Sequence, residues 1–267
     1  MRNNGQMTLL PCSAKRSFSV GKGILNSVFP SRCPVCDEPV KPFGALICTD
    51  CRQSFLIPQG SRCFLCGKPL AVQDSDREYC SDCSEKEHMF DRGYSLFVYG
   101  STAASLYRFK YKGRREYASF YAKCFVRLYA KGRDGLFIHE GRGILADGHT
   151  IEALIPVPLH QKRQKMRGYN QSEEFARAIS DRTGVPVHGD LVKRVKNTRP
   201  MKELDVIGRR NNLKNAFIIG KNDVLLNSVA IVDDIYTTGS TVDAIASLLR
   251  RQGIRYIYVF TIAVGTQ

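Results

Sequence analysis

Four apolar segments of the chain have the length and composition of buried strands, being rich in valine, isoleucine and aromatic residues. They cover residues 94–99, 153–157, 229–233 and 256–263. Between them the apolar residues recur with helical spacing. These helical segments are residues 102–109, 117–128, 172–182 and 242–251. Strands that alternate with helices predict an α/β fold built on a parallel sheet.

The apolar run at residues 229–233 leads into the segment with the clearest chemistry. It ends in Asp233 and Asp234, and a loop of small and hydroxyl-bearing residues follows: Thr237, Thr238, Gly239, Ser240 and Thr241. Such a loop lies at the sheet edge where α/β folds bind ligands, and the next helix directs free N–H groups into it. The hydroxyls suit a phosphate. The carboxylates would repel a phosphate and suit ribose hydroxyls, directly or through Mg²⁺.

This segment resembles the phosphoribosyl pyrophosphate (PRPP) signature of type I phosphoribosyltransferases. The resemblance implies that Asp233 and Asp234 hold the ribose and take part in catalysis, and that residues 237–241 hold the 5-phosphate. Apolar residues before two aspartates also resemble a Walker B strand. However, no Gly-Lys in this chain is followed by Ser or Thr, as the partner loop requires. A structural strand–turn–helix without a ligand is the remaining alternative.

Eight of the ten cysteines form four Cys-x-x-Cys pairs. The pairs are Cys33 with Cys36, Cys48 with Cys51, Cys63 with Cys66, and Cys80 with Cys83. Two such pairs supply the four thiolates of a structural Zn²⁺ site, so the pattern predicts two zinc ions. Disulfides would need an oxidising compartment, for which the sequence carries no signal segment, and a redox pair is usually single.

The order of the pairs leaves two ligand schemes open. In sequential ribbons the first two pairs bind one zinc and the last two bind the other, whereas a cross-brace combines alternate pairs. The short, similar gaps favour sequential ribbons. His88, shortly after Cys83, could replace a ligand, but we interpret it as a surface or packing histidine. Cys124, within a helical segment, is interpreted as a small core residue.

The positive charge lies mainly in the second part of the chain. The net charge of +15 divides into +2 for residues 1–92 (12 Lys and Arg against 10 Asp and Glu) and +13 for residues 93–267 (28 against 15). Anionic PRPP accounts for part of this excess, and a polyanion such as single-stranded DNA would account for more. Solvated Lys and Arg of a generally basic protein are the alternative.

Length and composition predict three parts. These are a disordered basic lead at residues 1–26, a double zinc ribbon at 27–92 and a phosphoribosyltransferase-like domain at 93–267. No apolar stretch reaches the roughly 18 residues that span a membrane, and the lead lacks an apolar signal core. We therefore expect a cytoplasmic protein without membrane insertion.

Three further segments are basic. Residues 109–115 combine Phe109 and Tyr111 with four cations: Lys110, Lys112, Arg114 and Arg115. We expect this segment to bind nucleic acid by phosphate contacts and stacking, unless its rings, above all Phe109, pack in the core. The second runs from residue 155 to Ser172, a candidate helix cap. The third, residues 194–202, is either disordered or a lid.

Together with the cysteine pairs, these segments resemble the ComF family, from Cys33 to about Ala263. That family joins a double zinc ribbon to a type I phosphoribosyltransferase-like domain, so the resemblance implies a parallel sheet of that type. It also implies pyrophosphate contacts at Pro158, phosphate contacts from Arg163 and Arg167, and closure of residues 194–202 over the pocket.

The family is tied to natural transformation. The resemblance therefore implies a zinc-ribbon protein that binds PRPP with Mg²⁺ and handles single-stranded DNA during uptake, with DNA-uptake or recombination proteins as partners. The alternative is an active phosphoribosyltransferase whose base or amine acceptor the sequence does not identify, because acceptor pockets lie in variable hood segments. The zinc ribbons stand where such a hood would be attached.

Overall fold

The protein is built around a four-stranded parallel sheet with the strand order β1-β9-β8-β5. The structure is a computed structural model that describes residues 31–42, 44–195, 216–220 and 225–266. The predicted lead at residues 1–26 and all but two residues of the predicted lid at 194–202 lie outside that part. The strands of the sheet are β1 (Arg92–Val98), β5 (Ala153–Pro156), β8 (Ser228–Tyr236) and β9 (Tyr256–Val264).

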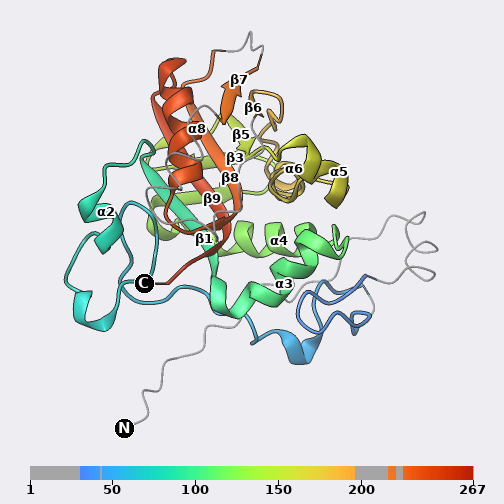
Figure 1. Cartoon of the computed structure of the whole chain (residues 1–267). Helices are drawn as coiled ribbons and strands as arrows, with labels where there is room; N and C mark the ends of the chain where they lie inside the picture. Colours follow the sequence, from blue (N-terminus) through green and yellow to red (C-terminus); the bar gives the residue numbers. More distant parts are fainter. Residues whose placement is uncertain (1–30, 43, 196–215, 221–224, 267) are drawn as a thin grey trace.

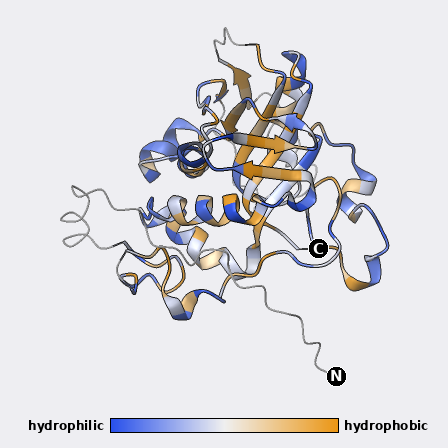
Figure 2. Ribbon diagram, turned by 180° about the vertical axis from the view of Figure 1, so that it is seen from behind, coloured by the Kyte–Doolittle hydropathy of each residue, from blue (hydrophilic) through white to orange (hydrophobic). Residues whose placement is uncertain are grey.

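Helices cover both faces of the sheet (Figure 1). They are α3 (Tyr99–Tyr111), α4 (Tyr117–Tyr129), α6 (Gln171–Thr183) and α8 (Ser240–Arg251), whereas α5 (Gln161–Arg167) has no buried residue. In β8, Ala230 and Val232 join the apolar cluster that includes α4 and α6, whereas Val229 and Ile231 join the cluster that includes α8. Successive strand residues thus pack on opposite layers, which explains the unbroken apolar runs. Figure 2 shows these hydrophobic strands at the centre of the molecule.

All four predicted strands and all four predicted helices are present, with ends shifted by up to three residues. The predicted end of the third strand at residue 233 is wrong, because Ile235 and Tyr236 continue to pair with Ala263 and Val264 of β9. The acidic pair therefore lies inside β8, where the backbone pairing fixes its position. The following helix begins at Ser240 instead of residue 242.

Smaller elements complete the fold. Two antiparallel sheets are formed by β2 (Leu136–His139), β3 (Gly143–Ala146) and β4 (His149–Thr150), and by β6 (Val192–Arg194) and β7 (Phe217–Ile219). Short helices are α2 (Ser81–Glu85), η1 (Thr49–Cys51), η2 (Val72–Asp74) and η3 (Arg133–Gly135). Across the described ranges, no helix combines the length and apolar character that a membrane crossing demands.

The N-terminal cysteine region divides between the two layers of the core. Cys33 and Ile47 pack in the cluster that holds α3, α4 and α6, whereas Cys63, Cys66 and Cys80 pack in the cluster that holds α8. Each half of the region thus shares apolar contacts with a different face of the α/β body.

Candidate functional site

A pocket of about 660 Å³ opens at the carboxyl end of the parallel sheet. Residues that follow three of the four strands line it: Tyr99 after β1, Val157 and Leu159 after β5, and the loop at 237–241 after β8. Parallel strands present their carboxyl ends at one edge, so residues far apart in the sequence meet there. Both aspartates and all five loop residues singled out in the sequence line this one pocket.

The acidic pair forms the floor of the pocket. Asp233 Oδ1 accepts hydrogen bonds from the Ser172 hydroxyl at 2.9 Å and from the Asp234 backbone N–H at 2.8 Å. Burial, followed by the neighbouring Asp234 carboxylate, raises the pKa of Asp233 from 3.8 to about 7. Asp234 Oδ1 lies 2.9 Å from Lys110 Nζ. Two adjacent carboxylates are therefore held beside one cation, an arrangement that a sugar hydroxyl or a metal ion would stabilise.

Ser172 acts differently from its predicted role as a helix cap. Asn170 is the N-cap of α6, and its Oδ1 accepts from the Ser172 backbone N–H at 3.2 Å. Asn170 also ties this helix to the pocket, because its Nδ2 donates to the Val157 carbonyl at 3.0 Å. The Ser172 hydroxyl is consequently available to Asp233.

The loop at residues 237–241, here called the hydroxyl loop, leads into the N-terminus of α8. Gly239 is the N-cap residue and has φ +71°, a left-handed conformation that favours glycine. A Cβ at Gly239 would lie 2.5 Å from the Tyr236 hydroxyl and 2.9 Å from His88 Cε1. The backbone is thus packed closely against both side chains, and the free N–H groups of α8 face a hydroxyl-lined turn suited to a phosphate.

Among the residues that the structure describes, four cations and two carboxylates line the pocket, a formal excess of two positive charges (4 − 2). The cations are Lys110, Arg163, Arg167 and Arg194. Burial, and then the like charge of Arg163, lowers the pKa of Arg194 to about 10. Pro158 is not a lining residue, although its neighbours Val157 and Leu159 are. The charge balance suits an anionic ligand.

The basic segment at residues 109–115 is divided between several environments. Phe109 is fully buried, as expected of it, and Lys110 and Tyr111 line the pocket. Arg114 pairs with Asp37 at 2.7 Å, and Arg115 pairs with Glu174 at 2.5 Å. These partners neutralise much of the segment's charge locally. Lys112 and Tyr111 are exposed.

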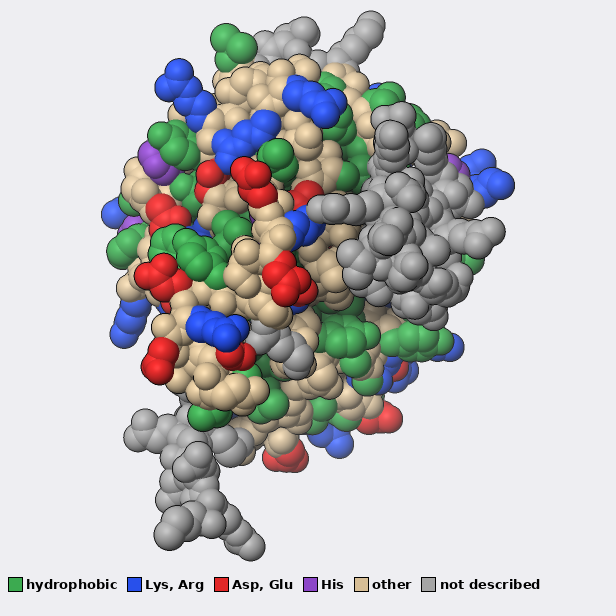
Figure 3. Space-filling view, turned by 60° about the vertical axis from the view of Figure 1, so that its left-hand side comes forward, with side chains coloured by type: hydrophobic (Ala, Val, Ile, Leu, Met, Phe, Trp, Pro, Cys, Tyr) green, Lys and Arg blue, Asp and Glu red, His purple; other side chains and the backbone are tan. Residues whose placement is uncertain are grey.

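The face drawn in Figure 3 likewise carries Lys and Arg side chains interspersed with Asp and Glu, so it does not form a continuous basic patch.

The eight paired cysteines form two tetrads of free thiols. One contains Cys33, Cys36, Cys48 and Cys51, and the other contains Cys63, Cys66, Cys80 and Cys83. The four sulfurs of each tetrad lie within 4.8 Å of one another. The Cys66 and Cys80 sulfurs are 3.6 Å apart, near the roughly 3.8 Å edge of a tetrahedron with 2.3 Å Zn–S bonds. Both tetrads fit a structural zinc ion, and the sequential pairing is confirmed.

The segment after the second tetrad supports the hydroxyl loop. His88 belongs to neither tetrad, and its side chain has no solvent exposure. Its Nδ1 lies 3.0 Å from both carboxylate oxygens of Asp243, in the first turn of α8, and Lys86 also pairs with Asp243. Burial alone would raise the pKa of Asp243, but these partners hold that pKa below its usual value. Of the two predicted roles, surface or packing, the structure shows that His88 is a packing histidine.

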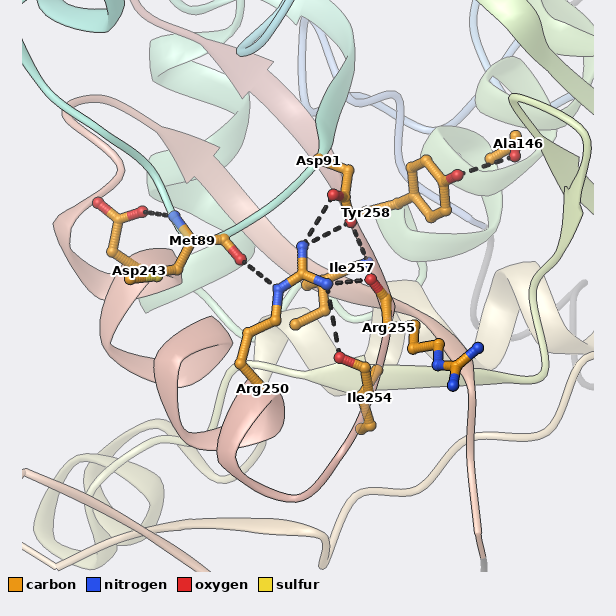
Figure 4. A network of polar contacts seen from close by, with 9 residues as sticks. All are labelled: Met89, Asp91, Ala146, Asp243, Arg250, Ile254, Arg255, Ile257 and Tyr258. Atoms are coloured by element: carbon orange, nitrogen blue, oxygen red, sulfur yellow. Dashed lines mark hydrogen bonds and ion pairs between the residues drawn. The ribbon is translucent and has the colours of Figure 1, made fainter.

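A second contact fixes the other end of α8 (Figure 4). Arg250 Nη2 lies 2.8 Å from both carboxylate oxygens of Asp91, and Arg250 Nε donates to the Met89 carbonyl at 3.2 Å. Asp91 also accepts from the Ile257 backbone N–H of β9 at 2.6 Å. The chain between the second tetrad and β1 is therefore attached to both ends of the helix that follows the hydroxyl loop.

Four residues that line the pocket are not predicted to do so by the sequence. The sequence suggests a helix cap for Ser172, nucleic-acid contacts for Lys110 and Tyr107, and the end of a strand for Tyr99. The four-residue spacing of Tyr99, Ala103, Tyr107 and Tyr111 is the signal that one helix face differs from the rest. Only the direct connection of β1 to α3 shows that this face meets the pocket.

Comparisons with known proteins agree with the cysteine pattern and extend it. Residues 24–84 match the model of the Double zinc ribbon domain. The chain is 33% identical over 238 residues to Competence protein F of Haemophilus influenzae, an alignment covering 88% of this chain and 97% of that protein. It is 30% identical to the DNA utilization protein YhgH of Salmonella typhimurium, covering 86% and 96%. It is 26% identical to Competence protein ComFC of Bacillus subtilis, covering 78% and 79%.

Proposed function

The chain belongs to the Competence protein F (ComF) family, and on that premise we propose that it binds PRPP and handles single-stranded DNA during DNA uptake. A single observation carries the PRPP assignment. The acidic pair Asp233–Asp234 and the hydroxyl loop, which the sequence signature places side by side, line one positively charged pocket at the carboxyl edge of a parallel sheet.

The chemistry of each part matches one part of PRPP. The hydroxyl loop and the N-terminus of α8 offer donors to the 5-phosphate, and Asp233 and Asp234 offer acceptors to the ribose hydroxyls. Arg163 and Arg167 on α5 also line the pocket, and their guanidinium groups suit the pyrophosphate. Mg²⁺ would enter with PRPP and neutralise charge on the pyrophosphate and the carboxylates.

The DNA-handling part of the proposal rests on the family. Its named members are described as competence and DNA utilization proteins. The net charge of +15 favours contact with a polyanion. We propose that the protein acts in the cytoplasm on the incoming strand, together with DNA-uptake or recombination proteins.

An active phosphoribosyltransferase is the second candidate. One observation favours it: the pocket extends beyond the hydroxyl loop and acidic pair to α3, which leaves room for an acceptor beside the ribose. In such a reaction the bond from ribose C1 to pyrophosphate breaks as a bond to the acceptor forms. The carboxylates would stabilise the positive charge that develops on the sugar.

Calorimetric titration with PRPP and Mg²⁺ tests the binding proposal. We expect the double variant Asp233→Asn/Asp234→Asn to lose PRPP binding while it retains two zinc ions per chain. The matched control is Asp181→Asn, which replaces an exposed carboxylate of α6 that does not line the pocket and should bind PRPP normally. Retained affinity in the double variant would refute the ribose assignment. Pyrophosphate release in the presence of candidate acceptors separates an enzyme from a binding protein.

A further inference from the structure

One wall of the pocket is aromatic, and neither phosphate nor ribose chemistry requires it. This wall is the face of α3 that carries Tyr99, Tyr107 and Tyr111, here called the tyrosine stripe, with Ala103 in the same row. Residues four apart lie on one side of a helix, so the rings project from a single face. They keep 40%, 54% and 51% of their surface exposed. Core packing therefore does not account for them.

The opposite side of α3 supplies the contrast. Thr102, Ser105 and Phe109 are buried there, and the Ser105 hydroxyl lies 2.5 Å from that of Tyr121 in the core. One face of the helix therefore packs in the core, and another lines the pocket. The tyrosines lie on the pocket face, where neighbouring exposed rings form an aromatic patch of the kind that marks a binding surface.

Arg167 joins the stripe to the charged part of the pocket. Its guanidinium carbon lies 4.7 Å from the centre of the Tyr111 ring, and its Nη2 donates to the Tyr111 hydroxyl at 3.0 Å. The Tyr107 and Tyr111 rings are 5.1 Å apart, so Arg167 orients the end of the stripe. Arg167 Nε is buried and has no hydrogen-bond partner among the residues described. A buried donor without a partner points to a ligand acceptor at this place.

We propose that the tyrosine stripe is a stacking subsite for a nucleobase, within the same pocket that takes phosphate and ribose. The proposal rests on the proposed function, because it supplies the third part of a nucleotide beside sites for the other two. Every base has a flat face that stacks on tyrosine, so the stripe would accept bases without reading their sequence. The small Ala103 stands between Tyr99 and Tyr107 in this row and also lines the pocket.

The base can belong to a free nucleotide or to a single strand, and the two sources differ in consequence. Lys110 lies on the same face of α3 and contacts Asp234, so the stripe and the acidic pair are adjacent. A strand whose base stacks on Tyr107 would place its sugar and phosphate where PRPP binds. Single-stranded DNA and PRPP would then compete for one pocket.

The test compares two probes, a fluorescein-labelled 12-nucleotide oligo-dT and deoxythymidine monophosphate, on zinc-loaded full-length protein. Tyr107→Ala/Tyr111→Ala should weaken binding of the stacking probe roughly tenfold to a hundredfold at fixed salt. Tyr107→Phe/Tyr111→Phe keeps the rings and should bind nearly normally. Tyr79→Ala, an exposed tyrosine of the second ribbon that does not line the pocket, is the matched control.

The outcomes separate the sources and the two proposals. If only deoxythymidine monophosphate binds in a way that needs the tyrosine rings, the ligand is a free nucleotide. If oligo-dT binding needs the rings and excess PRPP abolishes it, the ligand is a single strand. Unchanged binding of both probes by the alanine variant, or no recovery with phenylalanine, would overturn the subsite. PRPP carries no base, so the alanine variant should lose less affinity for PRPP than for the stacking probe, and any loss should come from the Tyr111 hydroxyl that Arg167 contacts. If wild-type protein does not bind PRPP but its probe binding needs the rings, the proposed function fails and the subsite stands.

Discussion

Replacing Asp233 with asparagine should stabilise the ligand-free protein at alkaline pH and abolish its binding of PRPP. Asparagine keeps an oxygen at the position of Oδ1, which accepts both hydrogen bonds described for Asp233, from Ser172 and from the Asp234 N–H. The substitution therefore removes a charge and leaves these bonds intact. A carboxylate retained at the expense of stability indicates selection for ligand binding.

The magnitude follows from the raised pKa of Asp233. Its native pKa is about 7 and the ordinary value is 3.8, so the unfolded chain releases this proton first as pH rises. Below pH 3.8 the carboxyl is neutral in both states and does not change the free energy of unfolding. Between pH 3.8 and pH 7 its burial destabilises the native state increasingly, and above pH 7 this destabilisation is constant. At about 1.36 kcal/mol per pH unit, it reaches at most about 4 kcal/mol at pH 8. Contact of the side chain with water in the pocket makes this an upper limit.

Thermal unfolding of zinc-loaded wild type and variant at pH 5 and pH 8 measures the effect. The difference in melting temperature should grow with pH, to roughly 10 °C at pH 8 if the upper limit is reached. Loss of zinc at low pH affects both proteins equally and cancels in the difference. Asp243→Asn is a control of opposite sign, because partners lower the pKa of Asp243. This variant should be less stable than wild type at pH 8, with the deficit shrinking as pH falls through the native pKa.

Ligand should close the stability gap between Asp233→Asn and wild type. PRPP with Mg²⁺ at about 1,000 times its dissociation constant stabilises a binding protein by about 4.1 kcal/mol, enough to offset an advantage of about 4 kcal/mol, and leaves the variant unchanged. The reasoning would be refuted if the ligand-free variant were no more stable than wild type at pH 8. An equal gain at both pH values would also refute it, because a charge effect must follow the titration.

The remaining predictions concern the loop, the ribbons and the basic segment. Gly239→Ala should lower the free energy of unfolding by about 1–3 kcal/mol and weaken PRPP binding. Gly253→Ala, at φ +89° with open space around it, should lower stability but leave PRPP binding by calorimetry unchanged. Cys63→Ser should lower the zinc content measured by mass spectrometry from two ions to one per chain and should weaken PRPP binding, since its tetrad precedes the segment that supports α8. Lys112→Ala should reduce the slope of log affinity for oligo-dT against log salt, whereas Arg114→Ala should mainly lower stability; equal slopes would contradict this.

Local sequence signals identify most of the fold and the polar half of the pocket. The apolar runs reveal the strands because a sheet covered on both faces needs continuous hydrophobic residues. The Asp233–Thr241 segment reveals its chemistry because strand, acidic pair, loop and helix are contiguous in the chain. The cysteine tetrads are recognisable for the same reason, since each is assembled from two neighbouring pairs.

Contacts between distant segments are beyond such reasoning. The sequence suggests that Lys110, Arg114 and Arg115 act together, but α3 ends at Tyr111, and Arg114 and Arg115 lie in the loop that leads to α4. Lys110 faces Asp234, while Arg114 binds Asp37 near the first tetrad and Arg115 binds Glu174 on α6. The partners lie tens of residues away, and only the packing of α3 and α4 against the ribbon and α6 determines them. A run of like charge in sequence is therefore poor grounds for a common surface.

The position of the second ribbon changes how the ribbons relate to the pocket. In place of a hood over an acceptor, the residues after Cys83 lie behind the hydroxyl loop, where His88 packs against Gly239 and, with Lys86, holds Asp243. In our proposal the acceptor or the strand meets α3 instead, which follows β1 directly and lines the pocket. Zinc at the second tetrad would then act on ligand binding through the shape of the loop, because the metal fixes the chain that supports it. The second ribbon thus supports the hydroxyl loop from behind and does not line the pocket itself.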